Sequence, residues 1–564
     1  MPLRRQGGCG EPRSGFGVRC NAFTGGVTDN GACRFPFRGV LCYWRVVSGR
    51  TEIGARASLV LLVVAVAVVL RLWAIGWGAP FLYHPDEHLI LQPAINMVRE
   101  RTANPHWFQY PSLLLYVEAA VVAGVQPLVQ APLSTDWVAN HIGPWDALPA
   151  QWPFVLGGRV VVALCAVLGV WGMYRAGRAY AGGPVGVGAA LLLTAAPLHN
   201  ESSHFMTTDV PAATLLTAAL ALGLAAARAP RLRRLAAAGV VAGLAAGTKY
   251  TAGIALLVPL AVAFSGSPRT AVQRVGVVLG AAAAGFLIAC PFALLGFAEF
   301  CNGLAQQRRN YLGDNVPGSD WRWYLAYLTT TGLLPAATVA SALGLGGILW
   351  RGVRTQPPGV TRVPRRVHVA LALVPLAYVA FLSVYPYRAQ RNLVIILPFL
   401  CLAGASVAWQ SVRRLSRRLA LVAYAALICA LAAPGLVACV RHDHLLAQPD
   451  TRTLALEWIE ANLPARSHIA REEYTPQVPA DRYQVSYAWS LAPAGYGWYL
   501  DQGVDYLVLS SSVYTRATHP PYVVGPTGPA FYRSIFSQLP LAAEIAPGPE
   551  RPGPVIRIYQ VPHA

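Results

Sequence analysis

Long apolar segments, separated by short clusters of arginine, fill residues 58–440. A run such as ASLVLLVVAVAVVLRLWAIG contains no acidic residue and is long enough to cross the hydrocarbon core of a bilayer. The pattern predicts eleven membrane spans, at 58–77, 153–174, 184–198, 209–227, two short arms within 235–266, 275–295, 325–350, 367–385, 393–410 and 419–440. We therefore expect a polytopic α-helical membrane protein.

The arginine clusters orient these spans. They lie at 175–178, 228–234, 269–274, 351–366 and 413–418, and none contains an acidic residue. Because basic residues favour the cytoplasmic side, we assign all five clusters and the N-terminus to the cytoplasm. Segments 78–152, 199–208, 296–324 and 386–392, and everything after about 441, then lie outside. The apolar run at 112–130 contains Glu118, and we place it in the outer interface because a crossing would put Arg175 outside.

Three parts of the chain differ in composition. Residues 1–55 are polar and Gly-rich, with cysteine spacings that match no zinc pattern, and indicate a disordered cytoplasmic tail. Residues 56–441 form the membrane part. Residues 442–564 regain Pro, Tyr, Asp and Glu; TRTLALEWIEANLP and PAFYRSIFSQL read as helices, and ARSHIARE, VDYLVLSS and PVIRIYQV read as strands. These patterns predict a small extracytoplasmic α/β domain.

Composition agrees with the pattern: 55% of residues are hydrophobic, 12% are charged and the mean hydropathy is +0.43. A net charge of +20 is compatible with nucleic-acid binding. Its distribution between apolar runs instead indicates membrane orientation, so we expect no nucleic-acid partner.

The first external loop begins FLYHPDEHLILQ. Pro85, Asp86 and Glu87 suit the first turn of a helix, where the helix dipole favours acids. Their place just outside the first span also suits a base that meets a lipid-borne substrate. Adjacent helical positions point in different directions, so we expect different roles for the two acids. His84 and His88 are four residues apart and are weak candidates for a metal site.

The second external loop reads PLHNESSHFMTTDVPAATLL. Asp209 is a natural N-cap for the span that follows it. Glu201, His199 and His204 add titratable groups, and four such groups exceed what capping requires. We therefore retain Asp209 as a catalytic candidate, and Glu201 and His204 as weaker candidates for sugar or acceptor contacts.

The only lysine of the chain, Lys249, lies in AAGTKYTAG between two short apolar arms, and the other 44 cationic side chains are arginines. A helix over 235–248 would reach about 21 Å, less than the roughly 30 Å of hydrocarbon, so the lysine lies below the outer surface. Arg388 and Arg391, in YPYRAQRNLVIILPFL, are also external. Three external cations near bilayer depth, with external carboxylates, suit an anionic lipid head group.

Several of these motifs, in this order, resemble polyprenyl-phosphate-sugar-dependent glycosyltransferases of the GT-C class. They are HPDEH, YPSLLLY, the stretch from GGRVVVALCAVLGVWGMYRAGRAYAG through Asp209, GTKYTAG and RAQRNLVIILPFL. The similarity is to the branch with protein O-mannosyltransferases and lipid A aminoarabinose transferases. It covers about 58–410, and the end of the chain also resembles the C-terminal region of bacterial members.

The resemblance implies a role for each matching residue. Asp86 matches the family's general base on the acceptor hydroxyl, with Glu87 and Asp209 as further catalytic candidates. Lys249 matches the phosphate-facing lysine, with Arg388 and Arg391 as helpers, and transfer would invert the anomeric centre. The implied partners are a polyprenyl-phosphate-linked sugar, the bilayer, and a protein, glycolipid or glycan acceptor. The implied location is a prokaryotic plasma membrane.

The sequence departs from the aminoarabinose transferases before Pro111, where Gln109 and Tyr110 replace an acidic and a basic residue. This change removes a metal ligand and a phosphate contact, so no cofactor is required and a divalent metal stays open. Tyr110 remains a weak candidate for a sugar contact.

Two other classes of protein are open at this point. A transporter or flippase would use Asp86, Asp209 and Lys249 as a relay, although such proteins usually have repeated halves and charges at the bilayer midplane. A non-catalytic scaffold would not need external cations beside carboxylates. The sequence does not identify the sugar or the acceptor.

Overall fold

The computed structural model describes residues 57–131, 133, 147–265, 267–312, 320–354, 363–518 and 528–562. The proposed tail at 1–55 lies outside these residues, and so does Arg56. Contacts between Cα atoms group residues 56–564 into one unit, so the boundary near 441 stays an interpretation.

The membrane part is helical. Its elements are the helix Ala57–Leu72, α2 (His88–Glu100), α3 (Leu113–Val129), α5 (Ala147–Ala181), α6 (Gly183–Thr194), α7 (Pro197–Glu201), η1 (Ser202–His204), α8 (Asp209–Arg228), α9 (Leu232–Ala246), η2 (Tyr250–Leu256), α10 (Leu257–Ala263), α11 (Pro268–Ala289), α12 (Phe292–Leu295), α13 (Phe297–Leu312), α14 (Trp321–Tyr327), η3 (Leu328–Gly332), α15 (Pro335–Val353), α16 (Arg365–Leu382), η4 (Gln390–Ile396), α17 (Leu397–Val412) and α18 (Arg417–Leu446).

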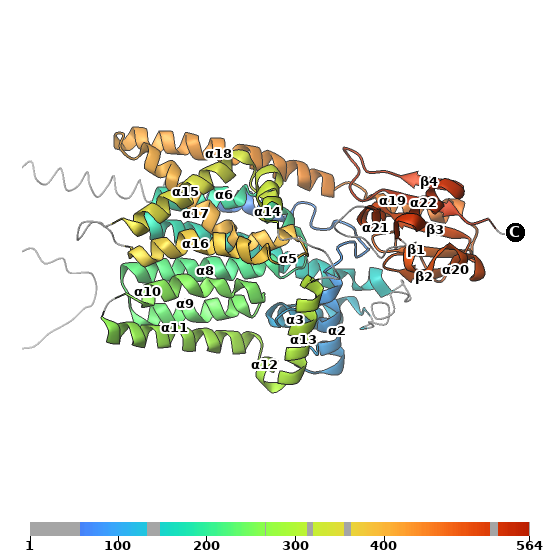
Figure 1. The fold of residues 1–564 in the computed structure, drawn as a ribbon, viewed down its shortest axis with the longest axis horizontal. Coiled ribbons are helices and arrows are strands. Elements are labelled where there is room, and N and C mark those ends of the chain that lie inside the picture. The colour runs from blue at the N-terminus through green and yellow to red at the C-terminus, as the bar shows by residue number, and fades with distance from the viewer. Residues whose placement is uncertain are drawn as a thin grey trace, which may run out of the picture. The chain divides into compact units, whose positions relative to one another are not determined.

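Each predicted span coincides with one to three of these helices, and the polytopic helical class is confirmed. Among the described residues, seven helices are long and apolar enough to cross a membrane, and several shorter apolar helices accompany them, so the number eleven stays a prediction. The long helices run side by side as a bundle, whereas α2 and α13 run across the bundle direction (Figure 1).

Small residues let neighbouring helices approach closely. A Cβ atom on Gly243 of α9 would lie 2.1 Å from the carbonyl oxygen of Ala282 in α11, and one on Gly285 of α11 would lie 2.2 Å from that of Val240. Without water, helix association in lipid depends on such close packing. The central helix α17 is almost entirely buried, which accounts for its continuous apolar sequence.

The C-terminal region is an α/β domain, as predicted. It contains α19 (Thr451–Asn462), β1 (His468–Glu472), β2 (Gln484–Ala488), η5 (Ala492–Ala494), α20 (Tyr496–Asp501), β3 (Tyr506–Ser510), α21 (Ser511–Thr518), α22 (Gly528–Gln538), β4 (Leu541–Ile545) and β5 (Ile556–Gln560). The strand order is β2-β1-β3-β5-β4. β1 is parallel to β2 and β3, and β5 is antiparallel to β3 and β4. Every residue of β1 is buried, as expected for a strand covered on both faces.

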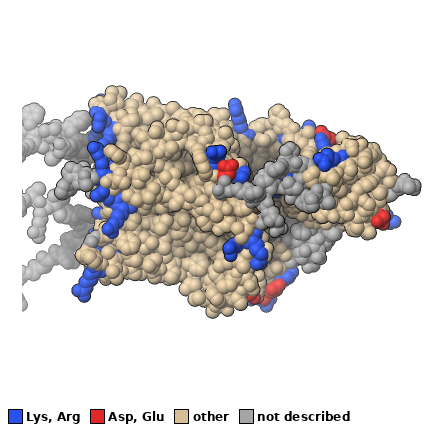
Figure 2. Space-filling view, in the orientation of Figure 1, with Lys and Arg blue, Asp and Glu red and all other residues tan. Residues whose placement is uncertain are grey.

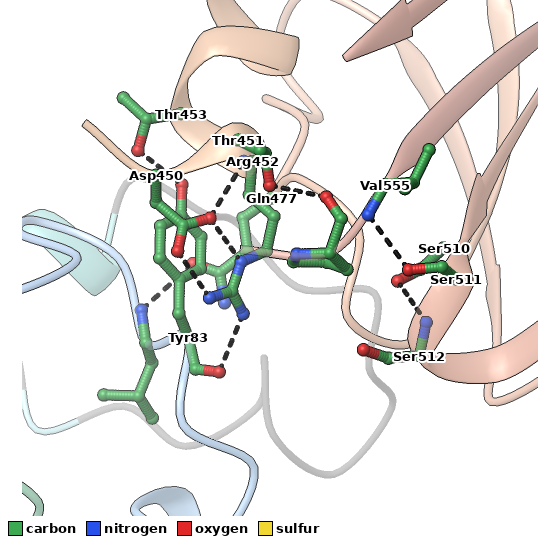
Figure 3. Close-up of polar contacts among 12 residues, drawn as sticks. Tyr83, Asp450, Thr451, Arg452, Thr453, Gln477, Ser510, Ser511, Ser512 and Val555 are labelled. Carbon is green, nitrogen blue, oxygen red and sulfur yellow. Dashed lines mark hydrogen bonds and ion pairs between the residues drawn. The ribbon is translucent and has the colours of Figure 1, made fainter. Parts of the chain in front are cut away.

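The α/β domain contacts the loop that precedes α2 (Figure 3). Arg452, at the start of α19, is held by the carboxylate of Asp450 at 2.7 and 2.8 Å, and its Nη1 donates to the carbonyl oxygen of Tyr83 at 2.9 Å. The guanidinium lies 4.0 Å from the centre of the Tyr83 ring, and the Tyr83 hydroxyl bonds to Thr453 at 3.0 Å. These contacts fix the chain three residues before Asp86.

Candidate functional site

A cavity of about 440 Å³ brings together residues that are distant in the sequence. Asp86 comes from the loop before α2, Glu201 from the end of α7, Arg388 from the segment that leads into η4, and Arg391 from the start of η4. The α/β domain also contributes, through residues that follow β1 and β3. The principal polar lining is Asp86, Glu201, Arg388, Arg391, Tyr474 and Arg516. The cavity therefore contains carboxylates and guanidinium groups together.

Asp86 forms an ion pair with Arg391. Its backbone N–H also donates to Nδ1 of His84 at 3.2 Å, and the His84 ring stacks on Phe205 with 4.4 Å between centroids. Burial lowers the pKa of His84, so this ring is neutral at pH 7 and accepts a hydrogen bond at Nδ1. The carboxylate of Asp86 is thus held at the cavity wall.

Glu87 points away from Asp86. Its carboxylate is fully buried and receives Nε and Nη2 of Arg159, each at 2.7 Å, and the backbone N–H of Met206 at 2.9 Å. Burial alone would raise the pKa of Glu87, but the charge and hydrogen bonds of Arg159 outweigh it and hold the pKa below its ordinary value. Glu87 does not line the cavity, and its catalytic role stays a prediction.

Lys249 and Asp209 form a second buried ion pair. The ammonium also donates to Oδ1 of Asn392 at 2.8 Å, and that oxygen accepts from the hydroxyl of Tyr311 at 3.3 Å. Asp209 is the first residue of α8 and makes no side-chain cap, so its carboxylate compensates the lysine instead of the helix end. The charge of Lys249 is therefore compensated at least partly by Asp209.

Lys249 also lines a smaller, mostly apolar pocket of about 130 Å³. Tyr110, Tyr311 and Arg308 line the same pocket, together with aromatic and apolar residues from the end of α16. Burial raises the pKa of Tyr110 well above its ordinary value, so its hydroxyl stays neutral. An apolar pocket with a cation in its lining suits a lipid that carries a phosphate.

Two buried hydrogen-bond donors near these pockets lack protein acceptors. They are Nε of Arg388 and Nδ2 of Asn392, and neither has a partner among the described residues. The nearest acid to Arg388 is Asp320, whose carboxylate is 4.0 Å from its Nη2. Buried donors normally have partners, so two unfilled donors near the pockets indicate a place for an oxygen-rich ligand.

Glu201 lines the larger cavity and has no hydrogen bond or ion pair among the described residues. Burial raises its pKa above the ordinary value for a carboxyl group. A carboxylate that faces a cavity with a raised pKa and no protein partner is a candidate for acceptor contact or proton transfer. If Asp86 is not the base, Glu201 is therefore a stronger candidate for that role than Asp209, which does not line the cavity.

His204 does not line the cavity. Its Nδ1 lies 2.9 Å from the carbonyl oxygen of Asn200 and its Nε2 lies 2.9 Å from that of Trp73. His204, His442 and Asp443 form the metal-competent group found among the described residues, and neither His84 nor His88 belongs to it. A metal at His84 and His88, and a substrate contact of His204, therefore stay predictions.

Four residues of the site were not predicted from the sequence: Arg159, Asn392, Tyr474 and Arg516. Tyr474 has a φ of 59°, in the left-handed region that a tyrosine rarely adopts, and the Arg516 guanidinium lies 5.2 Å from its ring centre. Both residues follow parallel strands at their carboxyl ends, where α/β sheets usually bind ligands. Asn392 was within a motif that we quoted, RAQRNLVIILPFL, but nothing in its spacing pointed to Lys249.

Comparisons with known proteins bear on the fold of the chain. Residues 155–294 match the model of a family described as dolichyl-phosphate-mannose-protein mannosyltransferase. No curated protein matches the chain in sequence at a significant level. Among solved structures, ArnT from Cupriavidus metallidurans bound to undecaprenyl phosphate is similar, with a TM-score of 0.51 and 16% identity over 88% of this chain and 97% of that one. The chain has a GT-C-like fold.

Two archaeal structures extend the likeness. The Archaeoglobus fulgidus oligosaccharyltransferase in its apo form gives a TM-score of 0.50 with 12% identity, over 81% of this chain and 70% of that one. AglB from Archaeoglobus fulgidus, in complex with an inhibitory peptide and a dolichol-phosphate, gives 0.50 with 14% identity, over 83% and 71%. The family match covers Arg159, Glu201, Asp209 and Lys249 but ends before η4. The family match and the similar structures together support the resemblance that the sequence motifs indicated.

Proposed function

We propose that this protein is a membrane glycosyltransferase that moves a sugar from a polyprenyl-phosphate donor to an acceptor hydroxyl on the extracytoplasmic face. One observation carries the proposal. Consecutive residues of one segment, Arg391 and Asn392, contact the candidate base Asp86 and the candidate phosphate-binding Lys249. A nucleophile-activating group and a phosphate-binding group are thus held beside each other, in adjoining pockets.

The donor phosphate is proposed to occupy the apolar pocket at Lys249, with the polyprenyl chain toward the lipid. Nδ2 of Asn392 and Nε of Arg388 supply donors that the protein itself leaves unused. As the bond between the sugar and the phosphate breaks, negative charge grows on the phosphate oxygen, and cations placed there lower the barrier. The phosphate is already a stable leaving group and needs no proton.

The acceptor is proposed to enter the larger cavity. Asp86 takes the proton of the acceptor hydroxyl while the acceptor oxygen attacks the anomeric carbon and the polyprenyl phosphate departs. Attack from the side opposite the phosphate inverts the anomeric centre. Arg391 also binds the Asp86 carboxylate, so a phosphate that attracts Arg391 would free Asp86 to act as the base. Donor binding would then activate the base before transfer.

The α/β domain is proposed to form part of the acceptor site. Tyr474 and Arg516 line the cavity from the side of the sheet, and a tyrosine ring and a guanidinium are groups that contact sugars and anionic groups. The contacts of Arg452 with Tyr83 place this domain against the Asp86 loop.

The proposal is tested by incubating the purified protein in lipid with a panel of labelled polyprenyl-phosphate sugars and measuring release or transfer of the sugar. Turnover with any donor, with polyprenyl phosphate as the second product, supports a transferase. Movement of intact donor across the bilayer without cleavage would instead support the transporter or flippase that the sequence leaves open. Asp501→Asn, an exposed acid of the α/β domain, serves as the matched control for substitutions of acids in the site.

A further inference from the structure

A groove on the side of the bundle lies between α5 and α8, away from the proposed catalytic site. It encloses about 790 Å³, and its walls and floor are apolar or small, with Leu168, Trp171, Leu215 and Ala218 among them. The rest of its lining is basic, and consists of Arg175, Arg178, Arg228 and Arg234. Basic side chains also form a band at one end of the bundle, on the face that Figure 2 shows.

The four arginines gather where α5 and α8 end. Nη2 of Arg228 donates to the carbonyl oxygen of Arg178 at 3.2 Å, which places the two helix ends side by side. Nη1 of Arg234 lies 3.4 Å from the carbonyl oxygen of Ala225, and the guanidinium of Arg175 stacks over Trp171 at 5.0 Å. Among the described residues that line the groove, none is acidic. Guanidinium groups suit an anion.

The length of the groove matches one leaflet. Leu168 and Arg178 are ten residues apart in α5, which corresponds to about 15 Å along a helix. The hydrocarbon core is about 30 Å thick, so one leaflet contributes about 15 Å. A lipid with its head group at the arginines would place an acyl chain along the apolar part, beside Trp171 and toward Thr214. A soluble anion would leave that part unfilled.

We propose that this groove binds an anionic phospholipid, with the phosphate among the arginines and one acyl chain between α5 and α8. Grooves of basic residues between membrane helices commonly bind anionic head groups. The site is distinct from the proposed donor site: Lys249 lies beyond the far end of α9, about 22 Å along that helix from its arginine-bearing end. The inference does not depend on the proposed function.

The experiment is native mass spectrometry of the full chain after reconstitution in nanodiscs that contain equal parts of phosphatidylglycerol and phosphatidylcholine. We expect retained phosphatidylglycerol on the wild type, and at least about tenfold less on Arg175→Gln/Arg178→Gln. The control is Arg414→Gln/Arg418→Gln. It removes the same charge from two exposed arginines, one between α17 and α18 and one at the start of α18, and both lie outside the groove. It should retain the lipid as the wild type does.

A third variant, Ala218→Phe, fills the groove without changing any charge and should also lose the lipid. Excess inorganic phosphate should not displace it, because a free anion gains nothing from the apolar part. Equal loss of lipid in the groove variant Arg175→Gln/Arg178→Gln and in the control would show that retention depends only on general surface charge. Displacement of the lipid by phosphate would show that the groove binds anions without using its apolar part. Either result would overturn the proposal.

Discussion

Arg391 and Asn392 are neighbours in the chain, yet their side chains contact opposite charges: Arg391 pairs with Asp86, and Asn392 accepts from Lys249. The segment that carries them, η4, is buried from Asn392 to Ile396. A short, well-packed stretch of backbone therefore joins the two pockets. We propose that it couples donor binding to activation of the acceptor.

Asn392→Ala should weaken donor binding more than it slows the chemical step. The change removes an acceptor of the Lys249 ammonium and an unused buried donor, so the ion pair with Asp209 alone must hold the lysine. We expect the KM for donor to rise about tenfold, a loss of about 1.4 kcal/mol that is typical of one hydrogen bond to a charged group. Steady-state kinetics with varied donor test this. Asn462→Ala, on the exposed side of α19, is the control, and an equal effect of both changes would contradict the assignment.

Arg159→Leu should destabilise the fold. It leaves the buried carboxylate of Glu87 without its counter-ion, which typically costs about 3–5 kcal/mol. Adding Glu87→Gln should restore a large part of that loss, because the uncompensated charge is removed. Because the folded pKa of Glu87 is lowered, its contribution is present above about 4.5, the ordinary value, and is lost as the pH falls through the folded pKa. Thermal unfolding in detergent from pH 3 to 7 measures both effects, and an unchanged Tm in Arg159→Leu would contradict them.

Glu472→Gln should change the pH dependence of the α/β domain. Burial raises the pKa of Glu472 to about 8, while backbone and Tyr532 hydrogen bonds oppose this rise. The folded state therefore holds a proton that the unfolded state releases, and the wild type should lose stability as the pH rises from about 4.5 to about 8. The glutamine stays neutral, so the variant should lack this slope and melt higher than the wild type at pH 8. Tryptophan fluorescence of the full chain measures the melting. Glu544→Gln is the control, and parallel profiles for Glu472→Gln and wild type would contradict the burial argument.

Arg452→Ala should reduce turnover without changing donor binding. The side chain anchors the carbonyl oxygen and ring of Tyr83, three residues before Asp86, and a base displaced by about 1 Å can cost up to a hundredfold in rate. We expect kcat to fall about tenfold or more with the Kd for donor unchanged. Arg482→Ala is the matched control, because Arg482 stacks on Tyr483 in the same domain at 5.3 Å. A fall in donor affinity with normal kcat would contradict the prediction that Arg452 positions Asp86.

The sequence predicted the apolar helices well because a bilayer imposes length and apolarity on every crossing segment. It also predicted α19, α22, β1, β3 and β5. It missed β2 and β4, because the five-residue segments QVSYA and LAAEI carry too little alternation to be told from loops. Short strands of this kind are fixed by their neighbours in the sheet, and not by their own pattern.

The sequence predicted which charged residues belong to the candidate site better than it predicted which residues they contact. Asp86, Lys249 and Arg391 were chosen because charges are expensive at the membrane, and the structure brings them to adjoining pockets. The partner of each charge could not be predicted, since Arg159 is 72 residues from Glu87 and Asp209 is 40 residues from Lys249. Tyr474 and Arg516 belong to another domain, and no local pattern links them to the loop at Asp86.

The central claim is that Asp86 activates the acceptor. The most direct test is single-turnover transfer by Asp86→Asn, with donor affinity measured on the same preparation and Glu201→Gln and Asp501→Asn alongside. The account predicts a loss of about 10² to 10⁴-fold in rate for Asp86→Asn with donor affinity within about twofold of the wild type, and normal transfer by Asp501→Asn. Full activity in Asp86→Asn together with such a loss in Glu201→Gln would contradict the account and assign the base to Glu201.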